Sequence, residues 1–423
     1  MKLELLRIIR SNDAEALGKL LRGRQTRLAE AETARAIIED VRRHGDRALV
    51  RLTKRFDRLD LARLGFTVTE REVREAHERV TKDLVPALRT AARNIRAAAG
   101  RQLPREWCIK TTAGVTVRQI VRPLERVACY VPGGRFALPS TVLMSVIPAQ
   151  VAGVREIVVT SPRPAPSVLV AADLLGVKAI FRLGGAQAIA AFAYGTESVP
   201  RADKIVGPGN RYVAAAKKLV SADCGIDFLA GPTELVVAGG RGEAKWIAAE
   251  LVAQAEHDPD AIAIFVTPSR RLALEVQACA ASLVKRLALD NARKSLATNG
   301  AIILTREITE AVELADALAP EHLTLLDDAA DMLDRVHSAG SIFLGSYSAV
   351  AAGDYASGTN HILPTGGAAR LRGGLSSADF VKTISVQQLS RAGLARLRDA
   401  IGVLAETEGL KAHAHSVETR FED

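Results

Sequence analysis

Aromatic side chains and long apolar runs are both scarce in this sequence. Aromatic residues make up 4% of the 423 residues, and no apolar run reaches the about 18 residues that a membrane-spanning helix requires. The start, Met1-Lys-Leu-Glu-Leu-Leu6, carries charge too early for a secretory signal. The cysteines have no C-x-x-C spacing and lie in apolar contexts, which is typical of buried, reduced thiols. They are Cys108, Cys129, Cys224 and Cys279. We therefore expect a cytoplasmic protein that does not enter a membrane.

Positive charge is in excess but is not concentrated. The chain has 57 basic and 48 acidic residues, for a net charge of +9, and no stretch interleaves basic with aromatic residues. A scattered excess favours solubility and the attraction of small anions, and it argues against a nucleic-acid partner. Hydrophobic residues at 48% and charged residues at 25% are typical of a soluble globular protein. The length predicts about two or three domains.

Hydrophobic periodicity divides the chain into helical ends and two α/β units. Apolar residues recur at helical spacing over residues 29–100 and again over 377–413. Between these ends, short apolar runs alternate with helical stretches, which predicts parallel sheets with a cleft suited to a ligand. The expected strands are 127–131, 156–160, 179–183, 204–206, 235–238, 261–266, 301–304, 322–326 and 341–344. The expected helices are 141–153, 167–175, 186–194, 211–221, 243–256, 268–287 and 308–318.

Three of the strand-to-helix turns in the first unit are rich in glycine. They are Pro132-Gly-Gly134, Gly184-Gly185 and Gly207-Pro-Gly-Asn210. Turns of this kind let backbone N–H groups approach a phosphate. None has the G-x-G-x-x-G spacing of a dinucleotide fingerprint, and glycine turns also occur in purely structural sheets. Nucleotide binding is therefore one interpretation of these turns, beside a structural one.

A stretch without regular periodicity, residues 351–367, carries Asp354 and His361 on a backbone rich in glycine. A loop of this length in a compact domain is usually functional or disordered, and its apolar residues favour order. The two polar side chains are candidate ligands. The alternative is a surface connection with a capping aspartate and a solvated histidine.

Two further clusters pair a histidine with an amide or an acid. Gln254 and His257 are three residues apart at the end of an expected helix, so they project from one face. A histidine in that position also commonly interacts with the helix dipole. Glu321 and His322 come directly before an expected strand. They are either an acid–base pair that exchanges protons near neutral pH or ordinary polar residues at a strand start.

A last cluster, Glu408 and His413, ends the final expected helix, where a histidine again has a routine electrostatic explanation. A nitrogen and oxygen ligand set nevertheless becomes available along the chain. Its members are Gln254, His257, Asp354 and His413. Neutral imidazole with carboxylate and amide oxygens suits a divalent ion such as Zn²⁺ that keeps open positions for a substrate.

Seven motifs occur in order from about residue 30 to the end of the chain. They are Glu125-Arg-Val-Ala-Cys-Tyr-Val-Pro-Gly-Gly134, Gly184-Gly-Ala-Gln187, Gly207-Pro-Gly-Asn210, Ala230-Gly-Pro-Thr-Glu234, Gln254-Ala-Glu-His257, Pro320-Glu-His322 and Gly353-Asp-Tyr-Ala-Ser-Gly-Thr-Asn-His361. With Glu408 and His413 at their spacing, these motifs make the chain resemble the histidinol dehydrogenase family, whose members oxidise L-histidinol to L-histidine. The family often has serine where Thr233 stands, a change that keeps the hydroxyl group.

The resemblance implies one zinc ion per subunit, held by the four ligands named above, and NAD bound at Tyr130, Gln187 and Asn210. It implies that Glu321 and His322 are the catalytic acid–base pair. The substrate-binding residues that it implies are Thr233, Gln254, His257, His322, Asp354, His361, Glu408 and His413.

The resemblance also implies the architecture, which is two Rossmann-like parallel α/β domains in tandem with small helical N- and C-terminal segments, in an intertwined homodimer. The expected parts are an N-terminal helical segment (1–24), a discontinuous first α/β domain (25–127 and 235–374) that carries the Glu–His pair and most zinc ligands, a second α/β domain on the NAD side (128–234) and a C-terminal helical dimerisation segment (375–423). Glu408 and His413 are then donated across the subunit interface.

In the implied reaction, His322 takes the hydroxyl proton of L-histidinol as a first NAD⁺ accepts hydride, and Glu321 activates water to hydrate the aldehyde before a second NAD⁺ is reduced. Zinc mainly orients the substrate. One alternative is a thiohemiacetal on Cys129, although nothing nearby in the sequence lowers the pKa of that thiol. Others are a relative that oxidises a different small polar alcohol, such as a sulfonated diol, and a silent metal- or nucleotide-binding protein. The intact acid–base pair argues against the silent protein.

Overall fold

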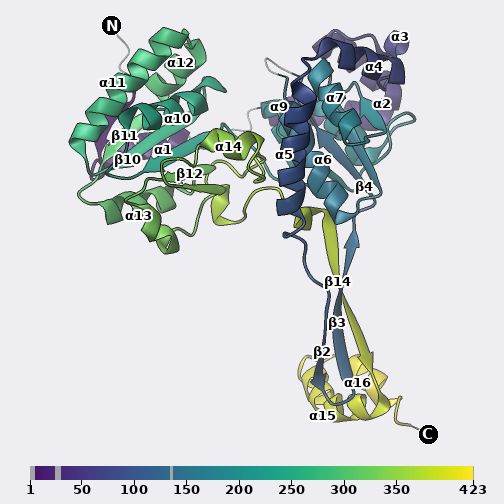
Figure 1. Cartoon of the computed structure of the whole chain (residues 1–423). Coiled ribbons are helices and arrows are strands. Elements are labelled where there is room, and N and C mark those ends of the chain that lie inside the picture. The colour runs from purple at the N-terminus through teal and green to yellow at the C-terminus, as the bar shows by residue number, and fades with distance from the viewer. Residues whose placement is uncertain (1–4, 24–29, 134–136, 423) are drawn as a thin grey trace.

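Two α/β lobes lie side by side, and a narrow extension projects from one of them (Figure 1). The computed structural model describes residues 5–23, 30–133 and 137–422. Every strand expected from the sequence is present, which confirms the α/β fold class. Among the described residues, no helix combines the length and the apolarity needed to cross a lipid bilayer.

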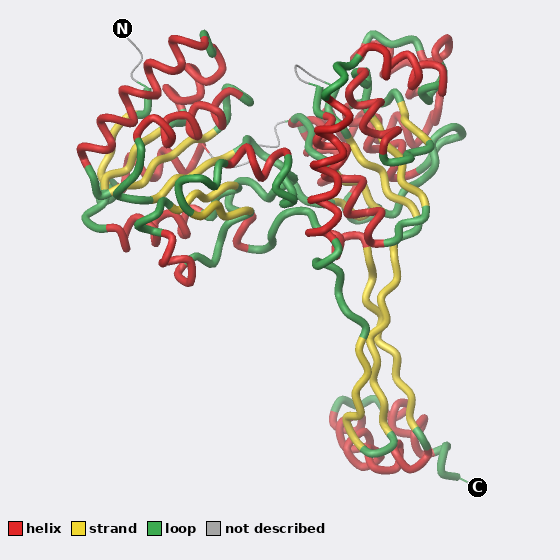
Figure 2. The backbone as a smooth tube through the Cα atoms, in the orientation of Figure 1, coloured by secondary structure: helices red, strands yellow, loops and turns green. Residues whose placement is uncertain are grey.

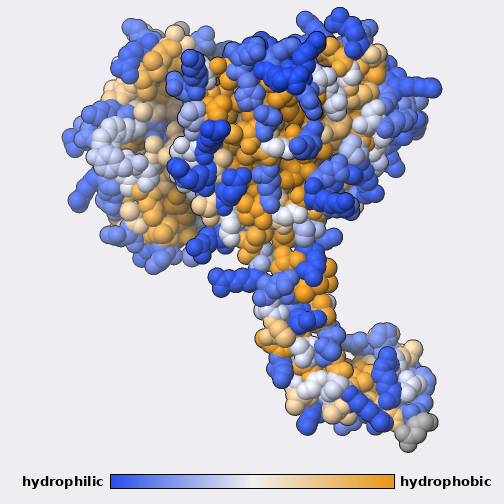
Figure 3. Space-filling view, turned by 45° about the vertical axis from the view of Figure 1, so that its right-hand side comes forward, coloured by the Kyte–Doolittle hydropathy of each residue, from blue (hydrophilic) through white to orange (hydrophobic). Residues whose placement is uncertain are grey.

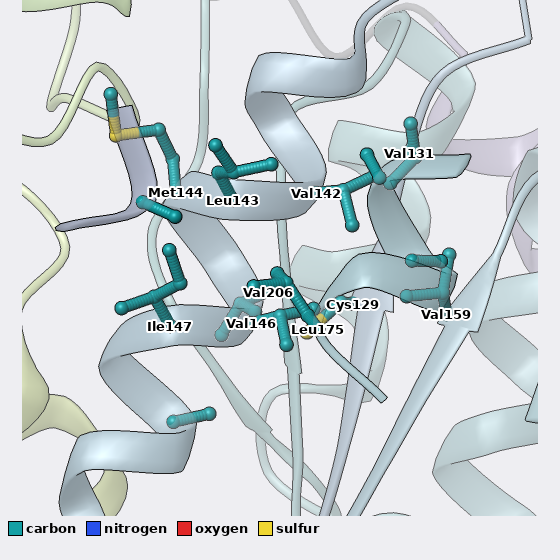
Figure 4. Packing of buried hydrophobic residues seen from close by; sticks show 14 of the residues in the cluster. Cys129, Val131, Val142, Leu143, Met144, Val146, Ile147, Val159, Leu175 and Val206 are labelled. Atoms are coloured by element: carbon teal, nitrogen blue, oxygen red, sulfur yellow. The ribbon is translucent and has the colours of Figure 1, made fainter. Parts of the chain in front are cut away.

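The first lobe is built on a parallel sheet of five strands in the order β6-β5-β4-β7-β8. The strands are β4 (Arg126–Tyr130), β5 (Glu156–Thr160), β6 (Ala179–Phe181), β7 (Lys204–Val206) and β8 (Gly225–Ile226). The helices that connect them are α6 (Pro139–Ala152), α7 (Pro166–Leu174), α8 (Gly185–Tyr194) and α9 (Arg211–Val220). Alternate residues of a strand point to opposite faces of its sheet. Cys129 therefore joins the core beneath α6 (Figure 4), whereas Tyr130 joins the core beneath α8.

The helices at the N-terminal side of the chain complete this same lobe. They are α2 (Ala31–Asp57), α3 (Leu61–Leu64), α4 (Glu70–Arg79) and α5 (Leu84–Ala99). Helix α2 packs on α8 and α9, α4 packs on α7, and α5 packs on α6. The expected grouping of residues 25–127 with 235–374 is therefore wrong for these helices, because their apolar faces are buried against the sheet of residues 126–226. Gly45 kinks α2 with φ 50°, at the break expected from Gly45-Asp46.

The second lobe contains a parallel sheet of six strands in the order β1-β11-β10-β9-β12-β13. The strands are β1 (Arg7–Arg10), β9 (Glu234–Ala238), β10 (Ile262–Thr267), β11 (Ala301–Leu304), β12 (His322–Leu325) and β13 (Ser341–Leu344). The helices are α1 (Ala14–Gly23), α10 (Ala244–Glu256), α11 (Arg270–Leu287), α12 (Asp290–Thr298) and α13 (Ile308–Leu318), with a 3₁₀ turn η1 (Ala330–Arg335). The expected helical segment 1–24 thus begins with an edge strand of this sheet, and its residues 1–4 and 24 lie outside the described part.

The extension is an antiparallel sheet of three long strands that ends in two helices (Figure 2). Its strands are β2 (Trp107–Thr112), β3 (Val115–Pro123) and β14 (Val381–Leu389), with β3 in the centre. The helices α15 (Arg391–Thr407) and α16 (Lys411–Glu418) cap the far end. The C-terminal segment expected as helical from 377 therefore starts with a 3₁₀ turn, η3 (Ser377–Phe380), and a strand.

The glycine-rich stretch 351–367 lies between the two lobes (Figure 1). Its first residues form a short helix, α14 (Val350–Tyr355), and the remainder is irregular up to a 3₁₀ turn, η2 (Ala368–Arg370). The Asn94 side chain of α5 donates a hydrogen bond to the carbonyl oxygen of Ala356 at 2.8 Å, so the first lobe supports this stretch.

The expectation of buried cysteines holds for Cys129 and Cys224 but is wrong for Cys108, which is exposed on β2.

Candidate active site

A cavity of about 220 Å³ lies where the two lobes meet, and side chains from both lobes line it. The first lobe contributes the start of α6 and the turn after β7. The second lobe contributes the residues that precede β9 and β12, the end of α10 and the stretch 354–365. The lining residues used below are Thr141, Gly207, Thr233, Gln254, His257, Glu321, His322, Asp354 and His361. Seven of the sequence-predicted site residues are thus brought together.

Glu321 and His322, the expected acid–base pair, lie at the amino ends of the strands in the second lobe. Glu321 directly precedes β12, and His322 is its first residue, paired in register with Leu235 of the parallel neighbour β9. The helices that connect parallel strands run in the opposite direction, so the carboxyl end of α10 lies near the amino ends of the strands. Gln254 and His257 are therefore carried to Glu321 and His322 by the fold itself.

Glu321 is fully enclosed by groups that hold its carboxylate. Its Oε2 accepts hydrogen bonds from the Thr233 hydroxyl at 2.6 Å and from the backbone N–H of Glu234 at 2.8 Å. Burial raises the pKa of Glu321 to about 7, although His322 and these two donors oppose the shift. A carboxyl group with that pKa can both give and take a proton near neutral pH.

His322 has one nitrogen fixed by the backbone and one directed into the cavity. Its Nδ1–H donates to the carbonyl oxygen of Glu234 at 3.1 Å, so Nε2 carries the lone pair in the neutral ring. Nε2 is buried without a hydrogen-bond partner among the described residues and lies 3.5 Å from Oδ1 of Asp354. Burial alone lowers the pKa of His322, but the carboxylates of Glu321 and Asp354 raise it overall to about 9.

Thr233 determines how Gln254 faces the cavity. The Thr233 hydroxyl donates its only proton to Glu321, so it can only accept from Gln254, whose Nε2 donates to it. The amide oxygen of Gln254 is then left without this partner and is available as a ligand. Gln254 is buried, whereas His257 is exposed one residue beyond α10.

Asp354 supplies the carboxylate that faces these groups. Burial favours its neutral form, but His322, His361 and His257 together hold the pKa of Asp354 below its usual range. In addition to His322, the side chains of His361 and His257 therefore lie close enough to Asp354 to lower its pKa. Within the described residues, no group of three His, Cys, Asp or Glu side chains forms a metal site by itself. One protomer offers an amide, an imidazole and a carboxylate, which fits a zinc ion that needs a further ligand from elsewhere.

His361 is held neutral beside the same cavity. Its Nδ1–H donates to the carbonyl oxygen of Asp354 at 2.9 Å, and its Nε2 accepts from the Thr141 hydroxyl at 3.3 Å. Burial lowers the pKa of His361, which favours this uncharged form. The histidine therefore ties α6 of the first lobe to the stretch that carries Asp354.

Glu408 and His413 are not brought to this cavity within one chain. Glu408 follows α15 and His413 lies in α16, and both are exposed at the far end of the extension (Figures 1 and 2). A single protomer thus assembles all of the sequence-predicted cluster except its C-terminal members.

A second cavity, of about 400 Å³, lies in the first lobe between α2, α8 and the start of α9. It brings together Tyr130, Gln187 and Asn210, as well as Asp57 at the end of α2, which the sequence motifs did not include. Asn210 caps α9 by accepting hydrogen bonds from the backbone N–H groups of Tyr212 and Val213. The turn after β7 lines both cavities, with Gly207 in the first and Asn210 in the second. Gly134 of the expected glycine turn lies outside the described residues.

Cys129 is unsuited to the thiohemiacetal alternative. It lies on the α6 side of β4, within the apolar core and outside both cavities. Burial raises the pKa of Cys129 to about 12, so the nucleophilic thiolate is not formed near neutral pH.

Comparisons with known proteins agree along the whole chain. The family profile described as histidinol dehydrogenase matches residues 21–421. Histidinol dehydrogenase of Methanothermobacter thermautotrophicus is 48% identical over 396 residues, which covers 92% of each chain. That of Syntrophotalea carbinolica is 47% identical and covers 99% of this chain and 100% of its own. The crystal structure of histidinol dehydrogenase from Elizabethkingia anophelis superposes with a TM-score of 0.94 at 35% identity, covering 100% and 99% of the two chains. The chain therefore belongs to the histidinol dehydrogenase family of NAD-linked oxidoreductases.

Proposed function

We propose that this chain oxidises L-histidinol through L-histidinaldehyde to L-histidine, reducing two NAD⁺ in the cytoplasm. The observation that carries the proposal is the buried Glu321–His322 pair, which faces Gln254, His257 and Asp354 in one cavity. A site that only binds a ligand has no need of two proton-transfer groups whose pKa values lie near neutrality and above it. Family membership supplies the substrate class.

Zinc is part of this proposal, and the donor set fits it. The amide oxygen of Gln254, the imidazole of His257 and the carboxylate of Asp354 would hold the ion, with His413 of the partner subunit as the fourth ligand. When bound there, zinc supplies a Lewis-acidic anchor that orients the nitrogen groups of the substrate. His361, Thr233 and the partner subunit's Glu408 complete the proposed substrate-binding set.

His322 accepts the proton of the substrate hydroxyl group at Nε2. The Glu234 carbonyl holds the proton on Nδ1, so the lone pair of Nε2 faces the cavity. The carboxylates of Glu321 and Asp354 raise the pKa of His322, and a cation held by Asp354 would offset one of these two charges and so favour the neutral, proton-accepting ring. The same nitrogen takes a second proton, from the hydrated aldehyde.

Glu321 prepares the water for the second half of the reaction. Its carboxylate accepts a proton from a water molecule while Thr233 and the Glu234 N–H hold it in place. Water can then add to the aldehyde carbon to form the hydrate. The pKa of about 7 leaves a large fraction of Glu321 ionised for this task.

NAD is assigned to the cavity that contains Tyr130, Gln187 and Asn210. When bound, NAD⁺ supplies the acceptor for the hydride that leaves the alcohol carbon and later the hydrate carbon. The turn after β7 supports this assignment, because Gly207 borders the acid–base cavity and Asn210 borders the other. The two cavities thus border on one turn, which a dinucleotide bound in one and reaching the other would require.

A homodimer completes the proposed site. The extension carries exposed apolar side chains that a monomer leaves in water, and Figure 3 shows apolar surface along it. They include Trp107, Ile109, Ile384, Val403, Leu404 and Leu410. Burial of this surface against a second copy is the simplest way to bring His413 to a zinc ion held by the partner's α10 and α14.

Reaction stoichiometry tests the proposed function. The zinc-loaded enzyme is incubated with limiting L-histidinol and excess NAD⁺, and NADH and L-histidine are quantified. Two NADH and one L-histidine per histidinol are expected, with loss of the reaction on chelation. One NADH per substrate, turnover of a sulfonated diol alone, or no turnover of any alcohol contradicts the proposal.

A further inference from the structure

A carboxylate lies in the wall of the NAD-side cavity that none of the sequence motifs includes. Asp57 is the last residue of α2, and its Oδ2 accepts a hydrogen bond from Nε2 of Gln187 at 3.0 Å. The Arg163 side chain donates to the backbone carbonyl oxygen of Asp57. Burial raises the pKa of Asp57, and Arg163 and Gln187 oppose that shift. From the described residues, the hydrogen bond of Gln187 reaches only one oxygen of this carboxylate, so part of its hydrogen-bonding capacity is left for a ligand.

A neighbour of Asp57, Tyr130, can hydrogen-bond to hydroxyl groups of a ligand. The Tyr130 hydroxyl accepts the backbone N–H of Gly185 at 3.1 Å, so its own proton remains free to donate. Asp57 is also near enough to contribute to the raised pKa of Tyr130. A carboxylate acceptor and a phenol donor thus lie beside each other on the floor of the cavity.

The rim of this cavity fits a planar base. Phe56 at the end of α2 and Tyr212 of α9 line it, and both are exposed, with 48% and 44% of their surface in water; the Arg55 guanidinium lies 5.1 Å from the centroid of the Phe56 ring. Half-exposed aromatic rings beside a pocket offer stacking faces. Asp57 lines this cavity and not the one that contains Glu321 and His322, so we assign the ribose beside Asp57 to the adenosine half of the dinucleotide.

We propose that Asp57 binds the 2′- and 3′-hydroxyl groups of the adenosine ribose and makes the enzyme select NAD over NADP. A carboxylate accepts hydrogen bonds from both hydroxyl groups of a ribose. A 2′-phosphate removes one of these donors and places a second anion against Asp57. Among the described residues that line the cavity, none is a lysine or arginine, and Arg163, whose charge acts on Asp57, is engaged by the backbone carbonyl oxygen of Asp57. This inference rests on the proposed NAD site.

Direct binding measurements separate this inference from the proposed activity. NADH and NADPH are titrated into the full-length enzyme without L-histidinol, with nicotinamide fluorescence as the signal. The unchanged enzyme should bind NADH at least about tenfold more tightly than NADPH, and more tightly than NADH that lacks the adenosine 2′-hydroxyl. Equal affinities for these three ligands overturn the inference without any variant. Selective NADH binding without oxidation of L-histidinol would instead contradict only the proposed function.

The Asp57→Asn variant locates the selectivity. The asparagine can still accept the Gln187 hydrogen bond, so the cavity wall is retained. NADH binding should weaken about tenfold while NADPH binding stays level or improves. Asp60→Asn is the matched control, because Asp60 pairs with Lys54 outside the cavity. If Asp57→Asn weakens the binding of NADH and NADPH equally, or changes neither affinity, Asp57 does not bind the ribose hydroxyl groups.

Discussion

The hydroxyl group of Thr233 donates a hydrogen bond of 2.6 Å to the carboxylate of Glu321 and accepts one from the amide of Gln254. One side chain therefore orients both the proposed base and a proposed zinc ligand. Thr233→Ser should retain most of the activity, because the serine hydroxyl can make both bonds. Thr233→Val should lower kcat and zinc affinity by about tenfold or more, because it leaves two buried polar groups without their partner. Steady-state kinetics and zinc competition measure both effects, and equal behaviour of the two variants would contradict this role.

The pH dependence of the second half-reaction should follow Glu321. Burial raises the pKa of this carboxyl group to about 7, so the protonated form dominates below that pH and cannot accept a proton from water. The rate of L-histidinaldehyde oxidation should fall about tenfold per pH unit below about pH 7 and level off above it. Glu321→Gln should remove this limb and slow aldehyde oxidation while alcohol oxidation continues. A pH profile that is the same in both enzymes would exclude Glu321 as the base.

Removal of His322 should separate chemistry from metal binding. His322→Ala should lower kcat for L-histidinol by about 10²- to 10⁴-fold, because it removes Nε2, which lacks a hydrogen-bond partner among the described residues and is proposed to take the hydroxyl proton. Zinc content should stay at one ion per subunit, since His322 contacts Asp354 but is not a proposed ligand. His44→Ala, an exposed histidine on α2 paired with Asp40, is the control. Loss of zinc from His322→Ala, measured by atomic absorption, would mean that the ring is a ligand.

Glu250 connects the two helices that carry the proposed ligands. It lies on α10 one turn before Gln254, and its Oε2 accepts the backbone N–H of Val350 at 3.1 Å, at the start of α14. Glu250→Ala should weaken zinc binding by about tenfold, because α14 then holds Asp354 less firmly. Glu250→Gln keeps an acceptor for Val350 and should lose less. Zinc affinity measured against a chelating dye checks the order, with exposed Glu275→Ala as the control.

Much of the fold follows from local patterns in the sequence. Strands such as β4, β9 and β10 are buried on both faces, so each is a nearly continuous apolar run in the sequence, which predicts a parallel sheet. The sequence does not predict β2, β3 and β14, because the side chains of β2 and β14 are largely exposed and those of β3 are mostly half-buried, so no continuous apolar run marks them. β1 was missed as well, since it forms an edge strand only by pairing with distant Ala301–Leu304.

The site was predictable where its residues share a motif. Gln254 and His257 share one face of a helix by its periodicity, and Glu321 and His322 are neighbours at the start of a strand, so each pair is short-range in the sequence. Asp57 gave no such signal, because it reaches Gln187 only through the packing of α2 on α8. The same long-range packing decided the lobe to which residues 31–99 belong. No pattern near Thr233 indicated that its hydroxyl joins the base to a ligand.

Mixing of two inactive variants tests most directly whether two protomers complete one site. His257→Ala and His413→Ala are purified separately, unfolded, mixed in equal amounts and refolded, and L-histidinol oxidation is followed by NADH absorbance. Each variant alone should be nearly inactive. In the mixture, half of the dimers are mixed and each has one intact site, so about a quarter of the wild-type activity should return. No recovery on mixing, or full activity of His413→Ala alone, would contradict the shared site.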